Sequence, residues 1–430
     1  MALSVLSVWE VRTATGSDTN GGGWVTGASG TDWSQYATPQ YALTNGTTAG
    51  TTTILTTSAT ADMVGNIAYV AGGTGSITGN WYQITAASVG TSITVDRSTG
   101  LTTGTGVTIN VGGALATLTQ AVTVAVQNNQ IWCTGSQTIT SVMILNLTSS
   151  SGTYPPFTIT GYSSARGDGG RFTLQTATNS TNLISYSSAN SYMLRNLLLK
   201  CTAGTPGYGI AAGTSGASYN LALDNCRITG FHIGIYGPYS GYYYILWLTL
   251  NNCEVDSCTS HGIENSAITH ILNSYIHGNG GDGVRMDDPG QAFEHITALN
   301  SVFYSNTAYG INLYGNTGGV VQNCAFVSNA TGFTHGSGSG GYGTVNVLNC
   351  IFDSNATAGI YNSAGITGVY YNNAFRNNGT DISNWPGVFV NPVSISASPF
   401  TNPTGGDFTL NSTSGAGAAC KGAGFQSTLI

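Results

Sequence analysis

The densest group of chemically capable side chains lies between residues 282 and 295. Within these 14 residues stand Asp282, Arg285, Asp287, Asp288, Glu294 and His295. A pair of carboxyl groups can cleave a glycosidic bond, one acting as the acid and the other as the base. Carboxylates in a loop can also hold calcium. Adjacent aspartates before Pro-Gly are, however, most often a solvated turn, and we favour that interpretation over catalysis.

An aromatic run precedes this group by about two repeats. It consists of Tyr242, Tyr243, Tyr244 and Trp247. Aromatic rings of this kind can stack on sugars, and together with Arg285 and His295 they form a candidate glycan-binding set. Tyr and Trp are equally favoured in subunit contacts, so both roles stay open.

A short phrase recurs seven times through this part of the chain. Each copy centres on an asparagine that is followed in most copies by Cys or Ser; the seven are Asn225, Asn252, Asn273, Asn300, Asn323, Asn349 and Asn372. An apolar residue stands two positions before and three positions after each asparagine, and a Gly-apolar pair follows in the first six copies. Such a repeat of short segments is the signature of a solenoid.

The parity of the apolar positions indicates how one repeat folds. Residues two apart on a strand face the same way, so the two apolar sets can both face inward only if the chain bends at the asparagine. Asparagine tolerates the left-handed backbone that such a bend needs. The glycine marks a second corner. Two corners and three short strands per turn predict a right-handed parallel β-helix in which the seven asparagines stack as a side-chain ladder.

The repeat resembles the asparagine ladder of pectate-lyase-like β-helix proteins over roughly residues 130–395. The phrase WEVRTATGSDTNGGGW near the start and the Asp407-Phe408-Leu410 phrase near the end resemble segments of β-helix proteins from cell surfaces and bacteriophages. The pectin hydrolases of this family use paired aspartates, which Asp287-Asp288 resembles. Their Asn-Thr-Asp, Gly-His-Gly and Arg-Ile-Lys phrases are absent from this sequence, so the resemblance implies the fold rather than the activity.

The spacing of the repeats also predicts a loop stripe. Long loops at 236–246, 285–295 and 334–343 alternate with short ones, so they should stack along one side of the solenoid. Loops on a rigid scaffold often carry function. We expect this stripe to be the binding surface.

The net charge of the chain bears on which kinds of molecule it is expected to bind. The chain has 10 Lys and Arg against 17 Asp and Glu among 430 residues, and a net charge of −7. Without a basic patch, nucleic-acid binding is not expected. No apolar run of 18 residues predicts membrane insertion. The eight cysteines lack the paired spacing of a zinc site, so no metal or other cofactor is expected apart from the calcium alternative. Cys258 can be either a solvent thiol or part of a pair.

The remaining segments predict the order of the domains along an all-β chain. Residues 1–45 form an N-terminal strand and turn segment without the features of a signal peptide. Five Thr-rich stretches predict a small antiparallel β-domain at 46–112. A helix at 113–129, with Leu115, Leu118, Ala121 and Val122 on one face, would cap the β-helix at 130–395, and residues 396–430 would close its other end.

Three functions follow from these expectations. The first is a structural or adhesive bacteriophage virion protein, a fibre or spike-like appendage that attaches to host surface polysaccharide outside the cell. It would contact other virion proteins and form a homo-oligomer, with a trimer as one option. The second is a polysaccharide depolymerase that uses Asp282, Asp287, Asp288 and Glu294. The third is a self-assembling extracellular filament. We commit to the first.

Overall fold

The computed structural model describes residues 3–100, 103–145, 156–186, 191–212, 218–237, 244–286, 294–314, 317–336, 343–362, 368–384 and 388–423. The chain divides into two compact units. One contains 1–138, 147–174 and 191–197, and the other contains 139–146, 175–190 and 198–430. These divisions follow packing within the fold, and the domain boundaries expected from the sequence stay predictions.

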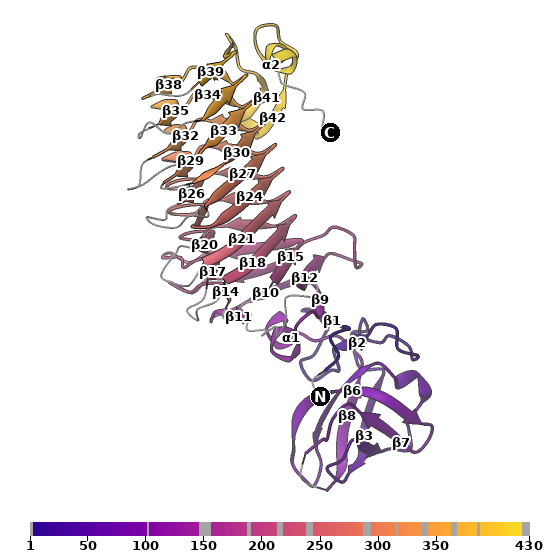
Figure 1. Cartoon of the computed structure of the whole chain (residues 1–430). Coiled ribbons are helices and arrows are strands. Elements are labelled where there is room, and N and C mark those ends of the chain that lie inside the picture. Colours follow the sequence, from indigo (N-terminus) through magenta and orange to yellow (C-terminus); the bar gives the residue numbers. More distant parts are fainter. Residues whose placement is uncertain are drawn as a thin grey trace. The chain divides into compact units, whose positions relative to one another are not determined.

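The first unit contains a closed antiparallel barrel (Figure 1). Its strands, in the order β3-β4-β7-β6-β5-β8, are Tyr41–Thr48, Thr53–Leu55, Ser92–Val95, Ile77–Ser88, Ile67–Gly72 and Gly104–Val111. A short 3-10 helix, Ala61–Met63, lies between β4 and β5. Five of the six strands were expected from the sequence. The missed strand, β3, contains Asn45-Gly46, which has the composition of a turn but lies where the register to β8 shifts.

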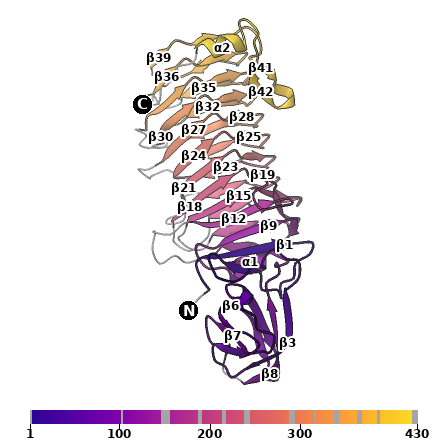
Figure 2. The same cartoon turned by 90° about the vertical axis from the view of Figure 1, so that its right-hand side faces the viewer.

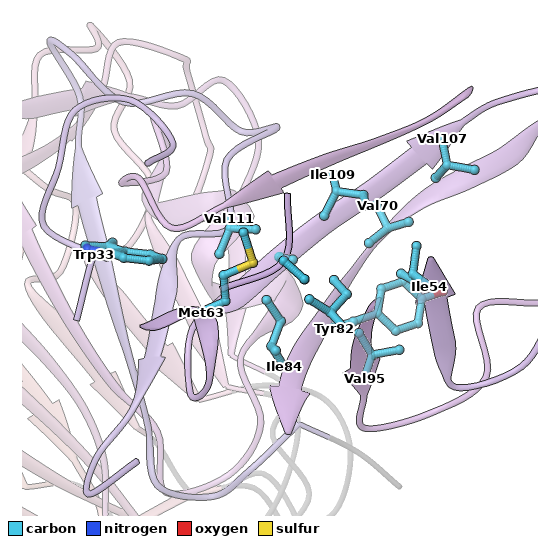
Figure 3. Close-up of a cluster of buried hydrophobic side chains, with 13 residues drawn as sticks. Trp33, Ile54, Met63, Val70, Tyr82, Ile84, Val95, Val107, Ile109 and Val111 are labelled. Atoms are coloured by element: carbon cyan, nitrogen blue, oxygen red, sulfur yellow. The ribbon is translucent and has the colours of Figure 1, made fainter. Parts of the chain in front are cut away.

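The barrel encloses a core of β-branched side chains. Ile54, Val70, Ile84, Val107 and Ile109 are fully buried and point toward one another (Figure 3). Alternating burial along β7 and β8 matches the period-2 pattern that predicted these strands. The barrel therefore has its own hydrophobic core.

The capping helix α1, Leu118–Val124, forms within the predicted segment. Its N-cap Thr117 accepts a hydrogen bond from the Gln120 backbone N–H at 3.1 Å. Asp18 accepts bonds from the backbone N–H groups of Ala116 and Thr117, each at 2.9 Å, and so satisfies donors ahead of the first turn. Leu118 and Ala121 are fully buried, as the predicted apolar face requires.

Strands before and after the helix form a sheet within the first unit. In the order β2-β1-β9-β12-β15 they are Gly23–Val25, Ser7–Arg12, Gln130–Thr134, Phe157–Tyr162 and Ser191–Arg195. Only the β1–β2 pair is antiparallel. The buried carboxylate of Glu10 on β1 accepts hydrogen bonds from Arg12 at 3.1 Å, from the Arg166 Nε at 2.8 Å and from the Tyr162 hydroxyl. This network pairs the buried charge.

The second unit is a solenoid whose coils contribute strands to three parallel sheets. We number the sheets in the order in which one coil visits them. In the first sheet the strands β18-β21-β24-β27-β30-β33-β36-β39 are Ser218–Asp224, Tyr244–Asn251, Ile268–Leu272, His295–Leu299, Gly318–Gln322, Val345–Leu348, Val369–Tyr371 and Val388–Val390.

The second sheet follows the asparagine bend. Its strands β16-β19-β22-β25-β28-β31-β34-β37-β40 are Leu197–Cys201, Arg227–Thr229, Glu254–Asp256, Tyr275–His277, Val302–Tyr304, Ala325–Val327, Ile351–Asp353, Ala374–Arg376 and Val393–Ser394. They are preceded along the chain by β10, Ser136–Thr138, and β13, Phe172–Thr176.

The third sheet follows the glycine corner. Its strands β11-β14-β17-β20-β23-β26-β29-β32-β35-β38 are Met143–Leu145, Ile184–Tyr186, Ile210–Ala212, Ile235–Gly237, Ile263–Asn265, Val284–Met286, Tyr309–Leu313, Thr331–His335, Ala358–Asn362 and Ile382–Ser383. The chain then forms a hairpin of β41, Phe400–Asn402, and β42, Asp407–Leu410, joined by a 3-10 turn at Pro403–Gly405 and followed by α2, Gly417–Ala423. The fold class expected from the sequence, a parallel β-helix preceded by a β-domain and a capping helix, is confirmed.

The bend after the first sheet occurs at the predicted asparagines. All seven have a positive φ between 51° and 54°, so they adopt the left-handed backbone. Side-chain amide bonds link neighbours such as Asn300 and Asn323, at 3.2 Å, and Asn323 and Asn349, at 3.3 Å. We call this row the outer ladder.

A second row of asparagines runs inside the solenoid. Asn279, Asn306, Asn329, Asn355 and Asn378 follow the second sheet, and the Nδ2 of each of the first four donates to Oδ1 of the next at 2.9–3.2 Å. We call it the inner ladder. Cys258 occupies the preceding place, where its backbone N–H donates to Asn279. Its thiol is buried and unoxidised, which excludes the solvent-thiol alternative, and burial raises its pKa to about 12.

Candidate functional site

The outward face of the third sheet carries a row of chemically varied side chains. Tyr236, Glu264, Arg285 and Asn312 occupy successive places in this row, because the parallel register pairs each with the next. Their strand neighbours, such as Ile263 and Val284, point into the core and are fully buried. Strand alternation therefore turns this row away from the core, and Asn312 alone among the four is covered and buried.

The row begins with an aromatic stack. The ring of Tyr208 lies 4.1 Å from that of Tyr236, with an angle of 19° between the planes, and 5.9 Å from the imidazole of His232. Burial raises the pKa of Tyr236 to about 12, with further contributions from Tyr208 and Glu264, so the phenol stays protonated at neutral pH. The stack presents neutral aromatic rings beside a charged group.

Asp282 lies at the centre of the site and is buried. Its carboxylate accepts a hydrogen bond from Asn312 Nδ2 at 2.9 Å and one from the Tyr309 backbone N–H at 3.3 Å. A carboxylate held in this way is a structural anchor, since its oxygens already have partners inside the protein. This arrangement favours a positioning role for Asp282.

His261 is oriented by the backbone beside that carboxylate. The Asp282 backbone N–H donates to His261 Nδ1 at 3.0 Å, so Nδ1 holds a lone pair and the ring proton lies on Nε2. The Asp282 carboxylate also approaches Nδ1, at 3.6 Å. We assign the shorter backbone bond as the one that sets the tautomer.

Arg285 brings a second donor to the same place. Its Nη1 lies 3.5 Å from His261 Nε2, and its guanidinium lies over the Tyr314 ring at 5.4 Å. In the tautomer with the proton on Nε2, both groups are donors that can bind one ligand oxygen. We define the third-sheet site as Tyr236, His261, Glu264, Asp282 and Arg285.

Several residues expected from the sequence lie outside the described residues. These are Asp287, Asp288, Tyr242 and Tyr243, together with the side chain of Tyr244. Asp282 and Arg285 both lie beside His261. The described parts of the three long loops are too short to test the loop stripe, so it stays a prediction.

The other candidates lie elsewhere. Trp247 and His295 are on the outer face of the first sheet, where Ile268 separates them in the register. Glu294 is buried, and the Thr317 hydroxyl donates to its carboxylate. The acidic residues proposed for a depolymerase therefore do not form one exposed pair among the described residues.

Tyr236 and His261 of the site, and Tyr208 beside it, were missed in the sequence. His261 and Tyr208 belong to coils that lie one and three repeats before Asp282, and only the register brings them beside it. A signal was present: the residue after each Gly-apolar pair faces outward on the third sheet, and reading that position alone gives Tyr236, Glu264 and Arg285 in succession.

A charged cluster on the second sheet was missed as well. Arg227 makes two bonds to the buried carboxylate of Asp256, at 2.9 and 3.0 Å, and Thr229 and Ser257 add one each. Burial opposes ionisation of Asp256, but these bonds outweigh it and lower its pKa. We call Arg227, Glu254, Asp256 and His277 the second-sheet cluster.

The same cluster is the one metal candidate in the described part of the chain. Ligand atoms of Glu254, Asp256 and His277 lie within 4.8 Å of one another. Arg227, however, already neutralises Asp256 and lies 3.4 Å from Glu254, and His277 Nε2 bonds Glu254 at 3.1 Å. A cation would have to displace this guanidinium, so the cluster fits an ion-pair network better than a metal centre.

Comparisons with known proteins bear on the fold. No curated protein matches the chain. Among solved structures, pectate lyase Pel9A is similar with a TM-score of 0.53 at 14% identity, covering 74% of this chain and 88% of that chain. The catalytic unit of thermostable GH87 α-1,3-glucanase from Streptomyces thermodiastaticus strain HF3-3 gives a TM-score of 0.37 at 10% identity, with 83% and 88% covered. Dettilon tailspike protein gives 0.25 at 12% identity, with 64% and 63% covered.

At 14% identity the likeness to pectate lyase Pel9A concerns the fold alone. Among the described residues, no helix is long and apolar enough to cross a membrane. The family model described as "Right handed beta helix region" matches residues 198–346 and 247–428, which together cover more than half of the chain. With the three parallel sheets and the asparagine bends, this match shows that the chain belongs to the right-handed β-helix family.

Proposed function

We propose that the chain binds polysaccharide through the third-sheet site, as part of a bacteriophage surface appendage. The observation that carries the binding proposal is the convergence of His261 Nε2 and Arg285 Nη1, 3.5 Å apart, beside the Tyr208–Tyr236 stack. Two donors aimed at one place suit a sugar hydroxyl or carboxylate oxygen. Aromatic rings beside them suit the apolar face of a sugar ring, as in other small-ligand sites.

The chemistry of the site favours binding over cleavage. Its buried carboxylate, Asp282, is occupied by Asn312 and Tyr309, and its histidine is oriented to donate rather than to accept. A glycoside hydrolase needs two carboxyl groups on either side of the bond to be cut. Among the described residues, the other carboxylate here is the half-buried Glu264.

The first experiment incubates purified protein with surface polysaccharides of candidate host bacteria. Retained protein and newly released sugar ends are both measured. We expect retention without release. Arg285→Gln, which removes one donor and the charge, should weaken retention about tenfold, equivalent to about 1.4 kcal/mol. Arg195→Gln, which removes the same charge from β15, is the control and should bind like the unchanged protein.

Two results would decide against this assignment. Retention that survives both Arg285→Gln and Tyr236→Leu would show that the glycan binds elsewhere. Release of sugar ends would favour the depolymerase alternative, and Asp282, Asp287, Asp288 and Glu294 would then be the residues to substitute.

The place on the virion is a separate proposal. The segments at 9–24 and around Asp407-Phe408 resemble those of phage and cell-surface β-helix proteins. We infer a homo-oligomer, with a trimer as one option, that contacts other virion proteins outside the cell. Mass spectrometry of purified particles should detect the chain, and light scattering over a concentration series should give a fixed oligomer. A persistent monomer would contradict the oligomer, and open-ended growth would favour the filament alternative.

A further inference from the structure

The C-terminal hairpin of β41 and β42 lies against the outer face of the second sheet, beside β25 and β28 (Figure 2). Phe408 of β42 contacts the rings of Tyr304, at 4.7 Å, and Tyr275, at 6.5 Å. Phe408 and Phe400 are buried in a cluster with Ala325, among others. The hairpin therefore covers part of this face and leaves an edge between itself and the outer ladder.

That edge is a groove with a volume of about 400 Å³. Its floor is the outward row Val302, Ala325, Ile351 and Ala374, which the parallel register places in line from coil to coil. Phe400, Phe408 and Leu410 form the wall on the hairpin side. These two sides are apolar.

The opposite wall is the outer ladder. Asn300 and Asn323 line the groove and are exposed. Asn323 Nδ2 donates to Asn300 Oδ1 at 3.2 Å and Asn323 Oδ1 accepts from Asn349 at 3.3 Å, so the ladder uses one N–H and one lone pair of this amide. A primary amide has two N–H groups and two acceptor lone pairs. The second of each is available on the exposed amides of Asn300 and Asn323, in two successive coils.

The groove has no charged lining residue. A polyanion or a basic peptide would find no counter-charge there. Amides that both donate and accept are suited to hydroxyl groups, and apolar side chains are suited to the carbon faces of sugar rings. The amides repeat with the strand spacing of ~4.8 Å, which is close to the length of one sugar unit in an extended polysaccharide.

From these observations we propose that the groove binds a neutral, extended glycan chain that runs along the solenoid, at a site separate from the third-sheet site. Tyr275 lines one end of the groove and is 42% exposed, so its ring can stack on a sugar there. The next members of the same outward row are Glu254 and Arg227. The uncharged surface of the groove therefore ends where the second-sheet cluster begins.

The test compares neutral linear glucans with uronic-acid polymers by affinity electrophoresis. Val302→Trp fills the floor of the groove without removing a polar group, and Tyr275→Leu removes the stacking ring. Each should weaken binding of the neutral glucan by about tenfold or more, equivalent to at least about 1.4 kcal/mol. Tyr36→Leu removes an exposed ring from the first unit and is the matched control. Thermal unfolding of each variant establishes that it is folded.

The outcomes separate this proposal from the proposed function. Neutral glucan binding that is lost in Val302→Trp but kept in Arg285→Gln supports a second site. Binding that Val302→Trp and Tyr275→Leu leave unchanged, or that Arg285→Gln alone abolishes, overturns the groove proposal and leaves the third-sheet site standing. An absence of neutral glucan binding, with retention on host polysaccharide intact, overturns the groove alone.

Discussion

Two outward faces of one solenoid differ sharply although the same repeat builds both. The third-sheet site combines Arg285, Glu264 and His261 with an aromatic stack. The groove on the second sheet has amides and apolar side chains and no charge. On both faces, the inward residues of each strand are buried apolar side chains. These inward residues determine the shape of each coil, so the outward residues can differ in chemistry from one face to the other.

The comparison implies that a substitution in the interior should lower the stability of the solenoid that carries both faces. Asn329 of the inner ladder accepts from the backbone N–H and the side chain of Asn306, each at 3.0 Å, and donates to the Phe303 carbonyl. Asn329→Leu would leave these buried groups without partners, at 1–3 kcal/mol each. We expect the free energy of unfolding to fall by about 4 kcal/mol in urea titrations, which is the largest effect predicted here.

Asn346→Leu is the control for that substitution, since Asn346 faces outward on the first sheet and accepts one exposed bond, from Val369 N–H at 3.3 Å. It should cost less than about 1 kcal/mol. Equal losses in the two variants would mean that the inner ladder contributes no more than a surface amide.

The second prediction concerns how stability depends on pH through a buried histidine of the solenoid, His335. Burial lowers the pKa of His335 to about 4, and its side chain is 1% exposed. The unfolded chain takes up this proton near pH 6.5 and the folded chain only near 4, so stability is complete above about 6.5 and falls as the pH drops between these values. The loss should reach up to about 3 kcal/mol.

His335→Gln should flatten this part of the pH profile in urea titrations, while His232→Gln, at an exposed position, should not. A profile that stays as steep in His335→Gln would assign the acid sensitivity to another group.

The third prediction separates structural charge from binding charge. Arg227→Gln leaves the buried Asp256 carboxylate without its ion-pair partner, and we expect a loss of about 2 kcal/mol at neutral pH, because Arg227 itself is partly exposed. Binding at the third-sheet site should be unchanged. Arg285→Gln should do the reverse, with normal stability and weakened binding. Binding that falls as far in Arg227→Gln would remove the distinction between the two faces.

Asp256 also gives this third comparison a pH signature. Its pKa in the folded protein is lowered, so its stabilisation is present above the unfolded value of about 3.9 and is lost as the pH falls below it. Without Arg227, its hydrogen bonds and charge no longer lower that pKa, so the pKa rises. The stability of Arg227→Gln relative to the unchanged protein should therefore improve as the pH is lowered toward the range in which Asp256 titrates.

Much of the fold could be predicted because the interior repeats. Asn252 and its counterparts have to bend the chain, and residues such as Ile276 and Phe326 have to point inward. The spacing of these residues along the sequence therefore predicts the path of each coil. The barrel strand β3 was missed because its Asn-Gly pair fits a bulge as well as a turn. Local composition cannot distinguish the two when the partner strand is distant.

The candidate site was predictable only in part. Asp282 and Arg285 are close in sequence, but His261 and Tyr208 reach them through the parallel register. Coil lengths vary from 21 to 27 residues between successive asparagines, so no fixed spacing marks residues that become neighbours. Sequence proximity also misled: Glu294 lies inside the solenoid and His295 faces outward on another sheet.

The hairpin at the end of the chain has a consequence for how the solenoid comes apart. In a solenoid each coil contacts its immediate neighbours, so the terminal coil can peel away and leave the next one exposed. Phe408 reaches Tyr275 and Tyr304, while its hairpin partner Phe400 belongs to the same buried cluster as Ala374. Through these contacts the hairpin links coils that are not adjacent. We therefore expect the coils at this end to unfold as one cooperative unit.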